Sequence, residues 1–300
     1  MAENYIEFLS AKEFGVEISL EELGEYDRIK DNIICRLVNR EGNEKRLMDK
    51  PFTPIEDLAV TYHIQIKNEI NRISSIAITN KMMDLYGVDA DTLHEQAVAN
   101  MEKILPTIIS PLRDLMMDSM MANFMNEYHV SREVAREMVE MAISEDVLEA
   151  SSGMLCITNN RGINGAACIV SPKIQQEVAE VLGGDYYVLP SSVHEVLAMP
   201  KNGDLSYEEL KKLVQSVNRY KVPEDAVLSD HVYEYSVKER VFRMSGDVQQ
   251  MNLSEKTQGM PEPISENAKM EGEDLQRNHM DGGTKKQQEN EVKKRSTRLC

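Results

Sequence analysis

The chain has 300 residues and a formal net charge of −17, with 51 acidic against 34 basic side chains. The residues before Gly246 hold 41 of the acidic and 25 of the basic side chains, and a surface this negative repels phosphate backbones and anionic lipids. Nucleic acid is therefore a disfavoured partner, and no segment has the ~20 consecutive apolar residues that span a membrane.

The N-terminal third predicts short helices around antiparallel strands. A helix is expected over Leu20–Lys30, and the β-branched run Asn32–Val38 favours a strand. A second short helix, Asn43–Lys50, ends before a proline. The strands Asp57–Lys67 and Arg72–Thr79 form a hairpin, because apolar side chains alternate along the first of them.

Two further helices have clear N-terminal caps. Asp89 or Asp91 begins a helix with Leu93, Ala97 and Met101 on its apolar face. Ser131 caps the second helix, one face of which carries Val134, Met138, Met141 and Ala142.

Methionines concentrate between these two caps. Leu112–Met125 is apolar on more than one helix face, and Met116, Met120 and Phe124 are candidate residues for binding a protein partner. A fully buried connecting helix has the same pattern, and burial is the favoured interpretation.

The central part predicts a second hairpin. The apolar runs Met154–Asn159 and Ala166–Val170 flank a sequence rich in turn residues. With the loop centred on Gly162, Cys156 and Cys168 lie opposite each other, and a change of register by one residue separates them. Two small buried thiols are the favoured interpretation, with a redox switch as the alternative.

Helices and strands alternate again toward residue 245. Ser171-Pro172 begins a helix and Gly183-Gly184 ends it. Ser206 and Glu209 form a capping box for the next helix, and one long strand is expected over His231–Met244. The two remaining extended runs are Tyr186–Leu189 and Val196–Met199.

The fold class that follows is α+β, with mostly antiparallel β-hairpins and helices packed against them, over residues 1–245. Its halves, 1–105 and 146–245, are joined by a helical segment, 106–145, and whether their strands share one sheet is open at this point. Residues 246–300 lack aromatic side chains and apolar periodicity, so this tail is expected to be disordered.

The chain is expected to be cytoplasmic. Its N-terminus is acidic and lacks the basic and apolar regions of a signal peptide. The four cysteines, among them Cys35 and Cys300, do not have the spacing of a zinc finger. No glycine-rich phosphate loop, dinucleotide fingerprint or calcium loop is present, so no cofactor or metal is indicated.

Three groups of phrases resemble one known family. They are Asp31–Asn39 with Asp57–Val60; Leu155–Asn159 with Gly165–Cys168 and Leu189–Val196; and Val227–Tyr233. They resemble the bacterial proteins grouped as domain-of-unknown-function family 5688, over roughly Asp31 to Val237. The resemblance implies no activity and no assigned residues. Relatives generally carry more chain before Asp31, so this chain is expected to be short at its N-terminus.

The densest polar chemistry lies at Pro190–Glu195. Ser192, His194 and Glu195 supply a nucleophile, a base and an acid. In a strand, however, His194 and Glu195 point to opposite faces, which a catalytic triad does not allow. The favoured role of these residues is to satisfy backbone groups at a strand entrance.

A metal site is the second chemical possibility. It joins His194 and Glu195 to Asp230 and His231, two acid–imidazole pairs at the starts of two strands. Zinc needs three or four converging ligands, which sequence adjacency alone does not provide. Separate hydrogen-bonded histidines are the favoured interpretation.

The favoured function is therefore non-catalytic binding of a protein or a small ligand, with Met116, Met120, Phe124, Asp230 and His231 as candidate contacts. The main alternative is a hydrolase or metal-dependent enzyme centred on the Pro-Ser-Ser-Val-His-Glu segment and the Asp230-His231 pair. A nucleic-acid adaptor that uses the basic residues after Lys285 is a weaker third hypothesis, since this mixed-charge end favours simple solvation.

Overall fold

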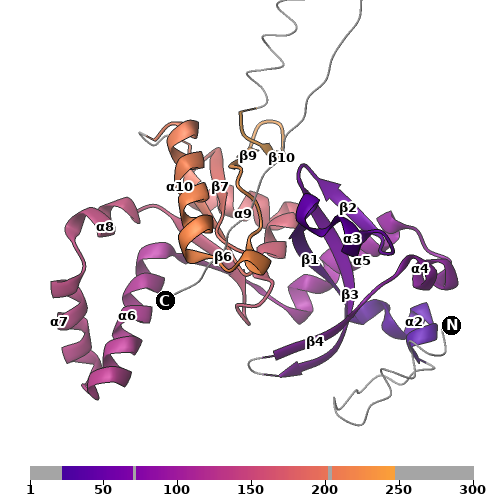
Figure 1. Cartoon of the computed structure of the whole chain (residues 1–300), viewed down its shortest axis with the longest axis horizontal. Coiled ribbons are helices and arrows are strands. Elements are labelled where there is room, and N and C mark those ends of the chain that lie inside the picture. Colours follow the sequence, from indigo (N-terminus) through magenta and orange to yellow (C-terminus); the bar gives the residue numbers. More distant parts are fainter. Residues whose placement is uncertain (1–21, 70–71, 202–204, 247–300) are drawn as a thin grey trace, which may run out of the picture. The chain divides into compact units, whose positions relative to one another are not determined.

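The computed structural model describes residues 22–69, 72–201 and 205–246, which Figure 1 shows in colour. The expected tail, 246–300, lies outside these ranges except for its first residue. The predicted fold class is confirmed, because helices accompany two sheets in which every strand pair is antiparallel.

The first sheet is built on one long central strand. That strand, β3 (Leu58–Glu69), pairs along one edge with β1 (Ile33–Asn39). Its other edge pairs first with β2 (Phe52–Ile55) and then with β4 (Arg72–Ala77). The predicted β3–β4 hairpin and β1 are thus confirmed, whereas β2 was not expected. Its proline is tolerated because β2 is a short edge strand.

The second sheet has the strand order β10-β9-β7-β8-β6-β5. Its strands are β5 (Thr107–Pro111), β6 (Leu155–Asn159), β7 (Tyr186–Pro190), β8 (Val196–Pro200), β9 (Tyr233–Ser236) and β10 (Val241–Met244). The two halves of the chain therefore do not share one sheet, and the segment 106–145 begins with an edge strand before its helices.

Two sequence predictions about this sheet are wrong. Gly165–Val170 is a 3-10 helix, η4, in which all six residues are buried, and β6 pairs with β5 and β8 instead. Cys156 and Cys168 are therefore not partners across a hairpin; Cys168 lines a small cavity of about 10 Å³ with Cys35. Gly165 starts this 3-10 helix in close contact with the neighbouring chain, since an added Cβ would lie 2.6 Å from the His194 carbonyl oxygen and 2.7 Å from Asn159 N.

The expected long strand over His231–Met244 is also wrong. The chain reverses after β9, Arg240 takes a positive φ of 54°, and β10 returns antiparallel with Val241 opposite Ser236. Tyr235, Val237 and Val241 are spaced by even numbers of residues, which favours one strand, but the charged run Lys238-Glu239-Arg240 lies in the turn.

Three of the helices begin at the predicted caps, whereas the described part of the expected helix Leu20–Lys30 is divided among η1, α2 and the start of η2. Asp89 caps α5, Ser131 caps α7, and Ser206 with Glu209 completes the capping box of α10. The α-helices are α2 (Tyr26–Ile29), α3 (Glu44–Leu47), α4 (Asn80–Tyr86), α5 (Ala90–Ile104), α6 (Leu112–Tyr128), α7 (Arg132–Ala142), α8 (Glu145–Ala150), α9 (Pro172–Leu182) and α10 (Tyr207–Lys221). The other 3-10 helices are η1 (Glu22–Gly24), η2 (Lys30–Asn32), η3 (Glu41–Asn43) and η5 (Glu224–Ala226).

One large hydrophobic core includes side chains from both sheets. Ile33, Tyr62 and Leu93 from the first half belong to the same cluster as Ile157 and Tyr186 from the second. A smaller cluster lies under α10, and a third joins α6 to α7. Within the described ranges, no helix is long and apolar enough to cross a membrane.

The methionine-rich helix is not buried as expected. Of the residues of α6, only Met121 is buried, although Met120 and Phe124 pack partly against the α6–α7 cluster. Met116 is half-buried. Within the described residues α6 packs mainly on α7 and reaches the second sheet mainly at its edge strand β5, so most of its apolar side chains remain in contact with solvent.

Candidate functional site

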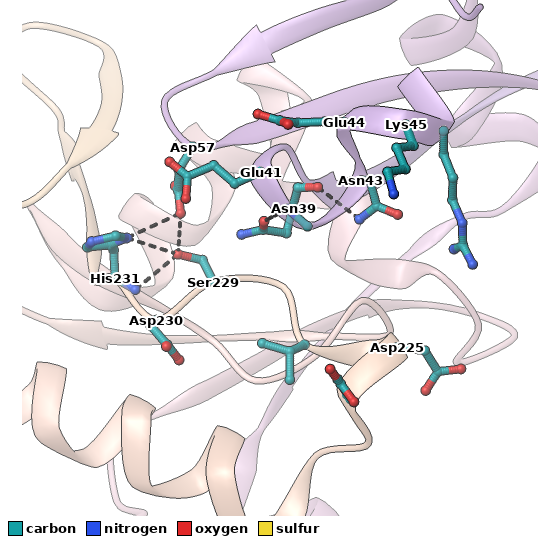
Figure 2. Close-up of a pocket in the computed structure, with 14 residues that line it drawn as sticks. Asn39, Glu41, Asn43, Glu44, Lys45, Asp57, Asp225, Ser229, Asp230 and His231 are labelled. Atoms are coloured by element: carbon teal, nitrogen blue, oxygen red, sulfur yellow. Dashed lines mark hydrogen bonds and ion pairs between the residues drawn. The ribbon is translucent and has the colours of Figure 1, made fainter. Parts of the chain in front are cut away.

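A polar cleft of about 1040 Å³ opens where the end of β1 approaches the segment that leads into β9. One wall comes from η3 and α3, and the other comes from η5 and the residues that follow it. The lining residues are Asn39, Glu41, Gly42, Asn43, Glu44, Lys45, Arg46, Asp57, Glu224, Asp225, Val227, Ser229, Asp230 and His231. Side chains from distant parts of the sequence thus meet around one space (Figure 2).

Asn39 holds the first wall in place. Its side-chain oxygen accepts a hydrogen bond from Gly42 N at 2.7 Å, and its backbone oxygen accepts one from the Asn43 side chain at 2.9 Å. Its Nδ2 donates to the carbonyl oxygen of Leu228 at 3.1 Å. One residue therefore shapes the loop before α3 and ties that loop to the opposite wall.

Asp57 lies at the floor of the cleft, in the tight turn between β2 and β3. Glu56 adopts a positive φ of 54° there, and Arg40 N donates to the Asp57 carbonyl oxygen at 2.8 Å. This turn directs the Asp57 carboxylate away from its own sheet and toward the segment before β9 (Figure 2).

Three side chains donate to the Asp57 carboxylate. Ser229 Oγ lies 2.7 Å from Asp57 Oδ2, His231 Nδ1 lies 3.2 Å from the same oxygen, and the Tyr233 hydroxyl donates to Oδ1. The Ser229 hydroxyl also accepts a hydrogen bond from His231 N at 3.0 Å. Asp57, Ser229, His231 and Tyr233 form what we call the Asp57 cluster. Figure 2 shows the first three of these side chains.

The cluster is polarised between a buried and an exposed end. Burial, and then the nearby Asp57 charge, raise the pKa of Tyr233 well above its usual value, so its hydroxyl keeps its proton and acts as a donor. Ser229 is fully buried, and its hydroxyl already donates to Asp57. The His231 side chain is 38% exposed. In the neutral ring with its proton on Nδ1, the tautomer that donates to Asp57, Nε2 is an acceptor.

Asn218 of α10 fixes the backbone beneath the second wall. Its Nδ2 donates to the Ser229 carbonyl oxygen and to Asp230 Oδ1, each at 2.8 Å. Asn218 is buried on the inner face of α10 together with Leu210 and Val214. Leu213, although apolar, is 48% exposed. Asp230 is exposed and points away from the Asp57 cluster (Figure 2).

The charge of the cleft is unbalanced. Six carboxylates line it against two cationic side chains, those of Lys45 and Arg46, and Val227 is its only apolar side chain. The carboxylates come from both walls, with Glu44 on one and Asp225 on the other. An arrangement of this kind attracts a cation and disfavours an anion or a purely apolar molecule.

The predicted Ser192, His194 and Glu195 group lies elsewhere, in the turn between β7 and β8. Glu195 accepts hydrogen bonds from the hydroxyls of Ser191 and Ser192 at 3.1 and 3.0 Å. Ser192 Oγ in turn accepts from His194 N at 3.0 Å, and Ser192 is only 7% exposed. The group therefore organises its own turn.

The His194 ring is also engaged. Its Nδ1 accepts a hydrogen bond from Asn164 N at 3.2 Å, while its carbonyl oxygen accepts one from Thr158 Oγ1 at 2.8 Å. These contacts connect the turn to β6 and to the start of η4. Neither His194 nor Glu195 lines the cleft.

The metal hypothesis fails for the part of the chain that the structure describes. No three His, Cys, Asp or Glu side chains converge there in a way that could hold a metal ion. His194, Glu195, Asp230 and His231 do not form such a group among these residues. His231 meets Asp57 instead, a residue 174 positions away in the sequence.

Sequence reasoning found His231 and Asp230 but missed the other members of the site. Asp57, Asn39 and Tyr233 were not singled out, although all three belong to the phrases that suggested a family. Those phrases were the available signal. They do not indicate that the β2–β3 turn, which carries Asp57, meets the segment before β9, which carries Ser229 and His231.

Comparison with known families agrees with that resemblance. A family model described as a family of unknown function, DUF5688, matches residues 1–237. The chain belongs to this family. The DUF5688 match starts before Asp31 and includes every residue that lines the cleft. No curated protein and no solved structure matches the chain.

Proposed function

We propose that the protein is a non-catalytic binding protein whose cleft takes a small organic cation, an amine or a guanidinium compound. The observation that carries the proposal is the pair of facing acidic walls over a floor held in place by the Asp57 cluster. This is the small-ligand form of the function that the sequence favours.

Three physical arguments support a small cation as the ligand. The cleft volume of about 1040 Å³ lies at the upper end of the range for small-molecule sites, roughly 300–1,000 Å³. Its polar lining supplies hydrogen-bond acceptors and little apolar contact. Its rigid floor lowers the ordering cost of binding, because Asp57 and Asn39 are already fixed by hydrogen bonds.

Calorimetric titration of the full chain tests the proposal, with spermidine as the cation and citrate as the anion. Spermidine is expected to bind with a Kd of about 10 µM to 1 mM, more weakly as salt rises, and citrate is not. The double substitution Glu44→Gln/Asp225→Asn removes one carboxylate from each wall and is expected to weaken binding about tenfold.

A matched control keeps the change in total charge constant. Glu177→Gln/Glu208→Gln removes two exposed carboxylates outside the cleft and is expected to change the affinity less than about twofold. Equal weakening by both double variants would show that net charge alone attracts spermidine. The cleft would then have no ligand role.

A second function is favoured by one observation, the His231–Asp57 hydrogen bond of 3.2 Å. An imidazole held in this way resembles a general base, with its free Nε2 available to a substrate hydroxyl or to water. The wild-type chain would then hydrolyse activated esters faster than His231→Gln, while both bind spermidine equally. Equal rates for the two proteins would exclude this function.

We also propose a cytoplasmic location. Cys35, Cys156 and Cys168 are free and buried, which suits a reducing compartment. Burial raises the pKa of Cys35 to about 12 and that of Cys168 to about 11, so both thiols stay protonated and unreactive. In a Cys300→Ser variant, Ellman's reagent should react with no thiol until the protein is unfolded.

A further inference from the structure

The helical hairpin of α6 and α7 leaves much of its apolar surface uncovered. The two helices lie side by side (Figure 1). Their shared core contains only three buried side chains, those of Met121, Ala135 and Val139. Helices of this length gain most of their stability from packing, so a core this small leaves room for a further partner.

The uncovered surface is clearest on α7. Ala135 and Val139 are four residues apart and face α6. Val134, Met138 and Met141 are spaced by four and then three residues, so they lie on one face of α7, beside the face that packs on α6. Val134 is 44% exposed and Met141 is 88% exposed. Met138, between them, is half-buried. We call these three residues the α7 stripe.

The surroundings of the α7 stripe are strongly acidic. Residues 112–150 contain nine carboxylates and three arginines. Two of the arginines are already paired, Arg132 with Asp118 and Arg136 with Glu140. Glu133 and Glu137 of α7 remain exposed. An apolar stripe with a negative border requires a partner that brings apolar groups and positive charge together.

We propose that the α7 stripe binds a basic amphipathic helix of a partner protein. Apolar side chains of that helix would cover Val134, Met138 and Met141, and its lysines or arginines would lie over Glu133 and Glu137. Methionine suits such a surface because its unbranched, polarisable side chain adapts to different shapes. A second copy of this chain is a poor occupant, since it would oppose nine carboxylates with nine more.

The chain has no tryptophan, which allows a direct assay. The probe is a synthetic helical peptide of alternating leucine and lysine pairs with one tryptophan, whose fluorescence reports binding to the full-length protein. A peptide with glutamate in place of lysine is the charge control. We expect the lysine peptide to bind and the glutamate peptide not to bind.

Substitutions then locate the contact. Val134→Ser/Met141→Ser is expected to weaken the lysine peptide at least tenfold, and Glu133→Gln/Glu137→Gln several-fold. Leu85→Ser/Tyr220→Ser removes two exposed apolar residues elsewhere, 69% and 70% exposed, and is expected to have no effect. Circular dichroism checks that each variant keeps its fold; since all these side chains are exposed, no loss of helix is expected.

Three outcomes would overturn the inference. Equal binding of the two peptides would remove the charge argument. Equal weakening by the α7 and control variants would remove the stripe as the contact. A dimer in sedimentation experiments that Val134→Ser/Met141→Ser dissociates would assign the stripe to a second copy of the chain. None of these outcomes depends on spermidine binding, because residues 112–150 do not line the cleft.

Discussion

Two polar clusters of this protein contain the same types of residue and have different roles. In the β7–β8 turn, two serines, His194 and Glu195 lie within five consecutive residues and bond mostly to one another. In the Asp57 cluster, a serine, a histidine and a tyrosine donate to a carboxylate that lies at least 172 positions away in the sequence. Of the two clusters, the second contributes lining residues to the cleft described above, and the first does not.

The comparison shows that density of polar residues in a sequence is a poor guide to a site. Neighbouring side chains such as Ser192 and Glu195 satisfy one another locally and complete a turn. Asp57 instead has donors on a distant segment, and that long-range contact leaves His231 partly exposed beside open space.

Removing the carboxylate of the Asp57 cluster should cost the most stability. Asp57→Ala leaves the buried hydroxyls of Ser229 and Tyr233 without their acceptor and is expected to lower the free energy of unfolding by about 3–5 kcal/mol. Urea denaturation measures this change. Glu44→Ala, an exposed residue on the cleft wall, is the control, with an expected change within about 0.5 kcal/mol.

The packing of η4 against the β7–β8 turn should be most sensitive to a substitution at Gly165. In Gly165→Ala the new methyl group would meet Thr158 Oγ1 and two backbone atoms, His194 O and Asn159 N. Overpacking against backbone is expected to cost about 3 kcal/mol by urea denaturation. Gly24→Ala, where nothing lies within 4 Å of the added Cβ, should be close to neutral. A neutral Gly165→Ala would mean that η4 packs less tightly than described.

Alkaline pH should weaken the Asp57 cluster. The pKa of Tyr233 is raised on folding, so the unfolded chain releases this proton first. The resulting stability is complete below pH 10 and is lost as pH rises toward the folded pKa, at up to about 1.4 kcal/mol per pH unit. Tyr233→Phe should be less stable than wild type at pH 8, and the difference should shrink above pH 10. A constant difference would contradict this assignment.

Glu195 should matter least. Glu195→Gln keeps an acceptor for Ser191 and Ser192 but removes the charge, and is expected to cost about 1 kcal/mol. Spermidine affinity should stay within about twofold of wild type, because charges outside the cleft are screened. A marked loss of spermidine binding in this variant would mean that the two clusters are coupled, and the distinction between them would fail.

Much of the local structure follows from the sequence alone. The caps at Asp89, Ser131 and Ser206, the β3–β4 hairpin and the Pro172 start of α9 depend on nearby residues, because caps and turns are short-range interactions. The antiparallel α+β class follows in the same way, from alternating strands with helices between them.

Tertiary contacts decided the rest. Gly165–Val170 has the composition of a strand, yet it is a buried 3-10 helix, and its first position lies so close to Thr158, Asn159 and His194 that only glycine fits there. The exposure of α6 depends on which elements fail to cover it, and its apolar pattern fits burial equally well. The cleft exists because Asp57 meets His231 and Ser229. That meeting requires two sheets to pack on one core, which no short stretch of sequence encodes.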